Sequence, residues 1–178
     1  MTMPQTDDRP FDFPAIDRRT VATLLIAGAV ATLAFDAFGQ GLSPLLGFAA
    51  LAPVPLAQSV LRTAFGLDSA PAAHLLHYFT GLVAYALGWM LVARPLAQRI
   101  APGLPWWLAA VAYGAGLWVF ALYGMAHLVA GLPAFLGFAG IAWVALIGHV
   151  LYAVVLAAVV EARRGGVTGG AAALTAAG

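Results

Sequence analysis

The sequence predicts an all-α integral membrane protein: a four-helix bundle with a short interfacial or re-entrant helix between the first and second spans. Three observations favour this class. Of the 178 residues, 63% are hydrophobic and only 8% are charged, which is too little polar surface for a soluble domain of that size. Four apolar stretches each reach about 20 residues, the length a helix needs to cross a bilayer. Prolines and glycines separate these stretches.

Composition also excludes several kinds of chemistry. The chain has no cysteine, which excludes disulfides, thiolate metal sites and cysteine nucleophiles. Its net charge of +1 indicates no nucleic-acid partner. The sequence contains no glycine-rich phosphate loop, no H-E-x-x-H and no G-x-S-x-G motif, so hydrolase and nucleotide chemistry have no support. The sequence therefore favours a protein that is not an enzyme.

The chain divides into three parts. Residues 1–17 are acidic and rich in proline, and we expect a cytoplasmic tail rather than a signal peptide because no small-residue cleavage site follows the first apolar run. Residues 18–164 contain all the apolar stretches and are predicted to form a single four-helix transmembrane domain. Residues 165–178 are mostly Gly, Ala and Thr, which cannot bury a core and are predicted to be disordered.

The first span is predicted over Thr20–Phe38, directly after two arginines. Small and polar residues recur along it at every fourth position and form one stripe, namely Gly28, Thr32, Asp36 and Gln40. Because the other faces are apolar, this stripe should face the other helices. Asp36 lies about 24 Å along the helix from Thr20 and therefore near the far side of the hydrocarbon.

Residues 39–71 are predicted to form a connector, since prolines and glycines divide them into apolar pieces too short to cross the membrane. Within the connector, Val54–Phe65 should form a short helix at the membrane surface, with Gly66 as its stop. Asp68 or Ser69 should cap the next helix, whose first turn contains Pro71.

The second span is predicted over residues 73–93 and ends at Arg94-Pro95. One face of it carries a histidine, a tyrosine and two glycines (His77, Gly81, Tyr85 and Gly88), and His74 lies one turn above His77. Small residues let another helix approach this face closely, so it should look inward.

The third span should begin at Pro105-Trp106-Trp107, because tryptophan prefers the headgroup level, and should run to about Leu128. Its predicted inward face consists of Tyr113, Gly116, Phe120, Tyr123 or Gly124, and His127. The fourth span is predicted from about Phe135 to Val160 and carries His149 and Tyr152 in its middle third.

The arginines predict the orientation. Seven of the eight fall on the side shared by both termini and the loop between the second and third spans, and only Arg62 lies opposite. The positive-inside rule therefore places both termini in the cytoplasm of a bacterial cell, with the protein in the inner (cytoplasmic) membrane. Asp36, His74, His77 and His127 then lie toward the outer leaflet, and His149 lies nearer the midplane.

This outer Asp/His cluster is the candidate site, because ionisable residues inside a membrane are costly and often functional. Imidazole and carboxylate groups suit a transition metal, with Asp36, His74, His77 and His127 as the ligands. Asp36 and His149 could instead form a proton relay. The structural alternative is that Asp36 only hydrogen-bonds a histidine or a loop amide and locks the bundle. His149 should need a separate partner, such as a hydroxyl or a backbone carbonyl.

Other functions stay open at this stage. A b-type haem could lie between His77 or His74 and His127, and a quinone could bind beside Asp36 and His149. The protein could also be an accessory or assembly subunit of a larger respiratory or photosynthetic membrane complex, with no chemistry of its own. The sequence assigns no cofactor, and its expected partners are the lipid bilayer and either such a complex or further copies of the chain.

The histidine, tyrosine and glycines of the second span, the glycine-rich aromatic third span, and Gly148-His149 with Tyr152 also carry a resemblance. In these features the chain resembles uncharacterised small four-span bacterial inner-membrane proteins of the YagU-like kind. The resemblance implies a four-helix inner-membrane bundle with histidines on the second and fourth spans, here His77 and His149. It implies no particular activity.

Overall fold

The protein is an all-helical bundle in the computed structural model, which describes residues 17–176 and the side-chain surroundings of residues 17–164. The described residues contain no strand. Four continuous helical stretches are long and apolar enough to cross a membrane, namely Arg18–Leu45, Ala70–Ile100, Trp106–Val129 and Gly140–Arg164. The predicted fold class is confirmed.

Three of the spanning stretches combine α-helical and π-helical segments. The α-helices are α1 (Arg18–Asp36), α2 (Ser43–Leu45), α3 (Pro53–Phe65), α4 (Ala70–Phe79), α5 (Tyr85–Gly88), α6 (Arg94–Ile100), α7 (Trp106–Val119) and α8 (Gly140–Ala176). The π-helical segments are Ala37–Leu42, Thr80–Ala84, Trp89–Ala93 and Phe120–Val129. A 3-10 turn, Ala134–Phe138, precedes α8.

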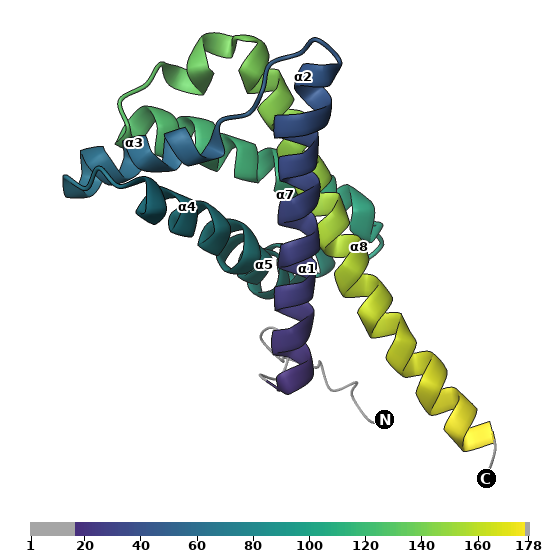
Figure 1. The fold of residues 1–178 in the computed structure, drawn as a ribbon. Coiled ribbons are helices and arrows are strands. Elements are labelled where there is room, and N and C mark those ends of the chain that lie inside the picture. Colours follow the sequence, from purple (N-terminus) through teal and green to yellow (C-terminus); the bar gives the residue numbers. More distant parts are fainter. Residues whose placement is uncertain (1–16, 177–178) are drawn as a thin grey trace, which may run out of the picture.

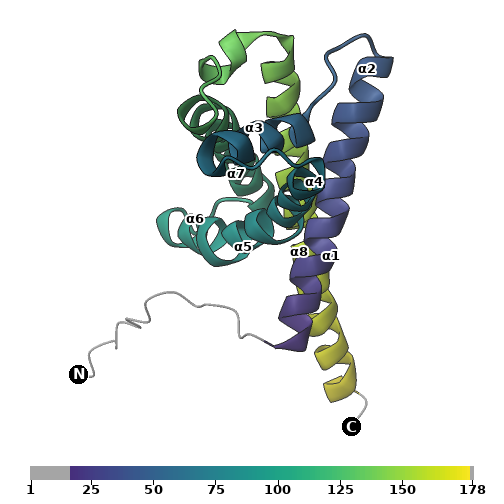
Figure 2. The ribbon, with the colours of Figure 1, turned by 60° about the vertical axis from the view of Figure 1, so that its left-hand side comes forward.

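Helix α8 is the centre of the bundle. It packs along α1 on one side and α7 on the other, and a larger share of it is buried than of the other three spans. Figures 1 and 2 both show α1 and α8 running side by side, with α3 and α4 forming a hairpin away from the end of the bundle where α1 begins. This hairpin packs on the π-helical end of the third span.

The helix ends follow the local sequence. Asp17 caps α1 by accepting the backbone N–H of Thr20 at 2.7 Å, and this hydrogen bond to the charged carboxylate lowers the pKa of Asp17. Gly66 ends α3 in the left-handed conformation, with φ of 66°. Ser69 caps α4 weakly, with the Ala72 N–H at 3.4 Å from its hydroxyl. The predicted connector helix and its stop are confirmed.

The second span does not end at Arg94-Pro95 as predicted, since α6 continues it to Ile100. Pro95 is the second residue after the π-helical segment Trp89–Ala93. The regular α-helical hydrogen bonds are already interrupted there, so the missing N–H of proline costs less than in a helix interior.

The fourth span also differs from the prediction at both ends. It begins at Gly140 rather than near Phe135, because Phe135, Leu136 and Gly137 form a left-handed turn with φ between 48° and 66°. The Phe135 ring packs against Trp118 at a centroid distance of 4.7 Å and holds this turn on the third span. At its other end α8 runs past Val160 to Ala176.

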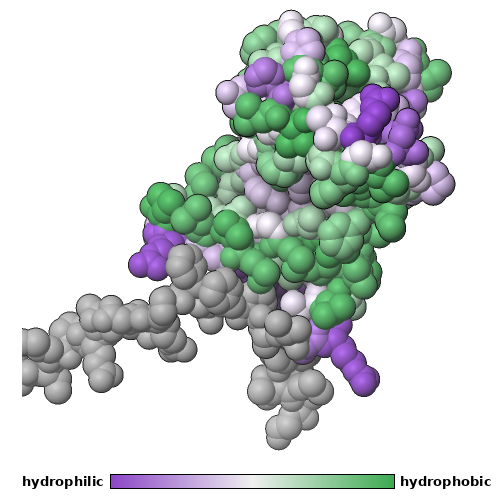
Figure 3. Space-filling view, turned by 90° about the vertical axis from the view of Figure 1, so that its left-hand side faces the viewer, coloured by the Kyte–Doolittle hydropathy of each residue, from purple (hydrophilic) through white to green (hydrophobic). Residues whose placement is uncertain are grey.

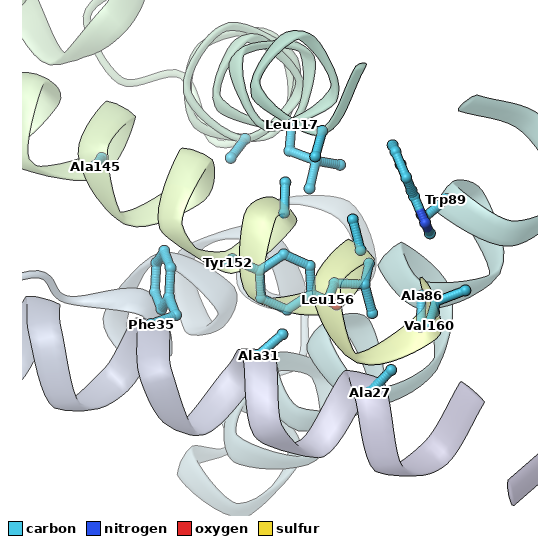
Figure 4. Packing of buried hydrophobic residues seen from close by; sticks show 14 of the residues in the cluster. Ala27, Ala31, Phe35, Ala86, Trp89, Leu117, Ala145, Tyr152, Leu156 and Val160 are labelled. Atoms are coloured by element: carbon cyan, nitrogen blue, oxygen red, sulfur yellow. The ribbon is translucent and has the colours of Figure 1, made fainter. Parts of the chain in front are cut away.

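The core is made mainly of small side chains. Seven alanines of its main cluster have no exposed surface: Ala27, Ala31, Ala86, Ala110, Ala142, Ala153 and Ala157. Figure 4 shows Phe35, Tyr152 and Leu156 filling the space among such residues where α1, α8 and the second span meet. Small residues allow the helix backbones to approach closely, which is the main source of packing energy between helices in lipid.

Two glycines occupy the tightest crossings. A Cβ at Gly28 of α1 would collide with the backbone of Leu82 in the second span, and a Cβ at Gly114 of α7 would collide with the backbone of His149 and Val150 in α8. Gly28 and Thr32 are buried and Asp36 is half-buried, so these three residues of the predicted stripe face the bundle, whereas its fourth residue, Gln40, is exposed.

On the third span the predicted inward face is only partly correct. Gly116 is exposed and has nothing within 4 Å of its added Cβ. Phe120 is 49% exposed, but its ring meets Tyr85 of the second span edge-on at a centroid distance of 6.3 Å. The glycine at the helix contact is Gly114, two residues earlier.

Candidate functional site

Asp36 and His77 form a polar pair between the first and second spans. His77 Nε2 lies 3.1 Å from Asp36 Oδ1 and 3.2 Å from Oδ2, and Gln40 Nε2 donates to Oδ1 at 2.8 Å. The side chains of His77 and Asp36 are only 12% and 19% exposed. The structure thus confirms that Asp36 faces the bundle and binds a histidine of the second span.

The other two predicted ligands lie elsewhere. His74 is exposed and stacks on Tyr78 at a centroid distance of 6.3 Å, and His127 Nδ1 donates to the carbonyl oxygen of Leu132 at 2.8 Å. Among the described residues no three His, Cys, Asp or Glu side chains form a group that could hold a metal ion. Asp36, His74, His77 and His127 are therefore not brought together as one metal site.

A large cavity lies next to the Asp36–His77 pair. Its volume is about 840 Å³, and it lies between α1, α3, the second span, the third span and α8. Figure 3 views the side of the molecule on which α3 and α4 lie, where apolar residues cover most of the surface and paler residues lie near its centre. The cavity wall is mostly apolar, and its hydroxyl and imidazole groups belong to Thr32, Ser59, His77, Thr80, Tyr85, Tyr113, His149 and Tyr152.

Four of these hydroxyls are already used within the protein. Each donates to a backbone carbonyl: Thr32 to Gly28, Ser59 to Pro55, Tyr113 to Tyr85 and Tyr152 to Gly81. The two tyrosine bonds, at 2.6 Å and 2.5 Å, reach carbonyls in and directly after the π-helical segment Thr80–Ala84. Because π-helical turns displace the regular backbone bonds, such carbonyls are free to accept a side chain from another helix.

Of the remaining groups on the wall, His149 Nε2 and the Tyr85 hydroxyl belong to neighbouring rings. The Thr80 hydroxyl and His77 Nδ1 also have no partner among the described residues. His149 is 7% exposed, and its Nδ1 donates to the carbonyl oxygen of Ala145 at 2.7 Å, which leaves Nε2 without a protein partner. The Tyr85 hydroxyl, on a ring 6.4 Å from the His149 ring, also has no partner among the described residues. Among the described residues, Trp89 Nε1 is the only side-chain nitrogen or oxygen atom that is buried and has no hydrogen-bond partner. His149 Nε2 and the Tyr85 hydroxyl are therefore open to the cavity.

Aromatic packing fixes the orientation of His149. Phe35 meets its ring edge-on, at 5.2 Å and 73°, and Tyr85 lies between His149 and Tyr152. Gly148 makes room for Phe35, because a Cβ there would come within 3.0 Å of the phenyl ring. The imidazole is thus held rigidly with one nitrogen toward the cavity.

Phe35 contacts both histidines on the wall, since its ring lies 6.4 Å from His77 and 5.2 Å from His149. Asp36 makes no hydrogen bond to His149 in the part of the chain that the structure describes; its imidazole partner is His77. The predicted haem ligands are not paired across the cavity either, because neither His74 nor His127 is among the residues that line it.

The comparisons with known proteins give no further assignment. No protein-family model, curated protein or solved structure matches the chain. Functional inference therefore depends on the cavity itself. The sequence indicated that Tyr85 faces inward and that His149 binds a hydroxyl or a carbonyl, and the second prediction is confirmed by the bond to Ala145. It did not indicate the cavity, and it gave Tyr85 no chemical role.

Proposed function

We propose that this small integral membrane protein binds a lipophilic molecule that has a polar ring head, of the isoprenoid quinone class. One observation carries the proposal: a mostly apolar cavity lined by the neighbouring rings of His149 and Tyr85, whose Nε2 and hydroxyl have no partner among the described residues. Ligand sites are typically apolar pockets in which a few polar groups fix the orientation of the ligand.

The dimensions of the site support such a ligand. The cavity volume of about 840 Å³ falls within the range of roughly 300–1,000 Å³ that is usual for small-molecule sites. His149 lies about 14 Å along α8 from Gly140, close to the middle of the hydrocarbon layer. A molecule that reaches this depth from the bilayer must itself be soluble in lipid.

The absence of charged residues from the cavity wall limits the class of ligand further. None of the described residues that line the cavity is Asp, Glu, Lys or Arg. A haem would bring two propionates and a phospholipid would bring a phosphate, and neither would find a cationic partner on this wall. A quinone head is neutral and carries only hydrogen-bonding oxygens, which matches the uncharged hydroxyl and imidazole groups of this wall.

The test is to extract the purified protein with organic solvent and identify the bound lipophilic molecules by mass spectrometry. A quinone-class molecule should co-purify, and Tyr85→Phe should lower its occupancy about tenfold, since one hydrogen bond contributes about 1–1.5 kcal/mol. Tyr123→Phe is the matched control, because Tyr123 is on the third span and does not line the cavity.

Three results would overturn the proposal. The extract could contain only phospholipid acyl chains, with no saturable binding of an added short-chain quinone. An absorption spectrum with a Soret band, or stoichiometric metal by elemental analysis, would instead favour the haem or transition-metal hypothesis. Co-migration with a cytochrome complex and an empty cavity would favour the accessory-subunit hypothesis.

We also propose that both termini are cytoplasmic and that the protein lies in a bacterial inner membrane. Three arginine-containing segments meet at one end of the bundle. Arg19 Nη2 donates to the carbonyl oxygen of Arg163 at 2.6 Å, and Arg163 Nε donates to Thr23 at 2.9 Å. Arg94 Nε binds Glu161 at 2.6 Å. This gathering of positive charge supports a cytoplasmic location for that end.

Reporter fusions test the orientation directly. Fusions after Gln98 and after Arg164 should both report the cytoplasm, and a fusion near Asp68, in the loop between α3 and α4, should report the outside. A cytoplasmic signal at Asp68 would contradict both the orientation and the depth assigned to Asp36.

A further inference from the structure

The geometry at His149 points to selectivity between the two redox forms of the ligand. We infer that the cavity prefers the reduced, hydroxyl-bearing form, a quinol, over the corresponding quinone. This inference rests on the proposed function and concerns the same site. It depends on which nitrogen of His149 carries the proton.

The bond to Ala145 decides that question. A carbonyl oxygen only accepts hydrogen bonds, so Nδ1 must carry the proton it donates at 2.7 Å. In a neutral imidazole the other nitrogen, Nε2, is then an acceptor. The rings packed on His149 belong to Phe35 and Tyr85, and no carboxylate lines the cavity among the described residues. Such uncharged surroundings favour the neutral ring.

An acceptor at this place requires a donor on the ligand. A quinol presents O–H groups and can donate one to Nε2, whereas a quinone presents only carbonyl oxygens and would leave Nε2 facing another acceptor. Leaving a buried polar group unpaired disfavours a ligand by about tenfold or more. The Tyr85 hydroxyl does not discriminate, because it can donate to either form. At the place where Tyr85 and His149 meet, the preference therefore comes from His149.

The rigidity of His149 makes the preference strong. Phe35 packs edge-on against the imidazole, Gly148 permits that close approach, and the bond to Ala145 fixes the ring within its own helix. The imidazole therefore cannot readily turn to offer its N–H to a quinone carbonyl. A preorganised group of this kind discriminates better than a mobile one.

The experiment measures binding of three probes to the purified protein in phosphatidylcholine nanodiscs by anaerobic calorimetry. The probes are a short-chain benzoquinol, its quinone and its dimethyl ether. The quinol should bind at least about tenfold more tightly than either of the others. For a two-electron couple, each tenfold preference raises the midpoint potential of the bound form by about 30 mV, which a redox titration would detect independently.

Variants separate the two polar groups. His149→Gln supplies both a donor and an acceptor, so the affinities for quinol and quinone should become equal within about threefold. Tyr85→Phe should weaken both forms by the same factor and preserve the preference. The dimethyl ether tests the same hydrogen bond in the wild-type protein, which keeps the test valid if His149→Gln fails to fold.

The outcomes are distinguishable. Equal binding of all three probes, or tighter binding of the quinone, would overturn the inference about His149 and leave the proposed function intact. Saturable binding of none of them would overturn the proposed function itself. Tight binding of the quinol that His149→Gln does not alter would also overturn the inference, because the preference would then arise from another group.

Discussion

Replacement of Gly114 by valine should destabilise the protein strongly. A Cβ at this position would lie 2.6 Å from Val150 Cα and 2.7 Å from the His149 carbonyl oxygen, and backbone atoms cannot rotate away as a side chain can. Helices α7 and α8 would have to separate along their crossing. Overpacking of this kind typically costs about 1–3 kcal/mol, so the apparent melting temperature should fall by roughly 2–12 °C. Thermal denaturation followed by size-exclusion chromatography in detergent measures this fall in melting temperature.

Gly116→Val is the matched control. It makes the same change two residues later on the same helix, where nothing lies within 4 Å of the added Cβ. The loss of glycine and the gain of a β-branched residue are equal in the two variants, so the difference between their melting temperatures isolates the crossing. Equal melting temperatures would mean that α7 and α8 do not approach closely at Gly114.

These two glycines also show why the third span was harder to orient from sequence than the first. In the first span Thr32 and Asp36 are polar, so lipid cannot be their surroundings and the stripe must face the bundle. In the third span both faces are apolar, and hydrophobicity does not distinguish lipid from protein core. Tyr113, Gly116 and Phe120 do share one side by helical spacing. Only the position of α8 reveals that Gly114 is at the contact.

The candidate site, like the orientation of the spans, could be predicted only in part from the sequence. Spacing along a helix gives the depth of a side chain in the membrane, and depth correctly brought Asp36 and His77 to one level. Direction around the helix is not given by depth, so His74, one turn from His77, is exposed. The cavity depends on how far α3 and α4 stand from α8 and on the π-helical turns that release carbonyls for Tyr113 and Tyr152. No local pattern encodes those distances.

Asp36→Leu should destabilise the protein although leucine is the better residue for a membrane. The substitution would leave His77 Nε2 largely buried without its carboxylate partner and would remove the acceptor of Gln40. We expect the free energy of unfolding to fall by about 1–3 kcal/mol. This is less than the cost of breaking a fully buried pair, because both side chains are partly exposed. Asp36→Asn keeps an oxygen that can accept from His77 and should lose less than half as much. Unchanged stability of Asp36→Leu in thermal denaturation would remove Asp36 from the site.

A double-mutant cycle then decides whether the pair itself provides this stability. His77→Leu alone should also destabilise the protein, because the Asp36 carboxylate would keep only the bond from Gln40. In Asp36→Leu/His77→Leu only the exposed Gln40 amide loses its partner, and two apolar side chains can pack between the first and second spans. The double variant should therefore be more stable than the sum of the single losses predicts, with a coupling energy of about 1–2 kcal/mol. If the losses of stability measured by thermal denaturation are additive, Asp36 and His77 act independently, each through its own surroundings. The hydrogen bond between them would then contribute little to holding the two helices together.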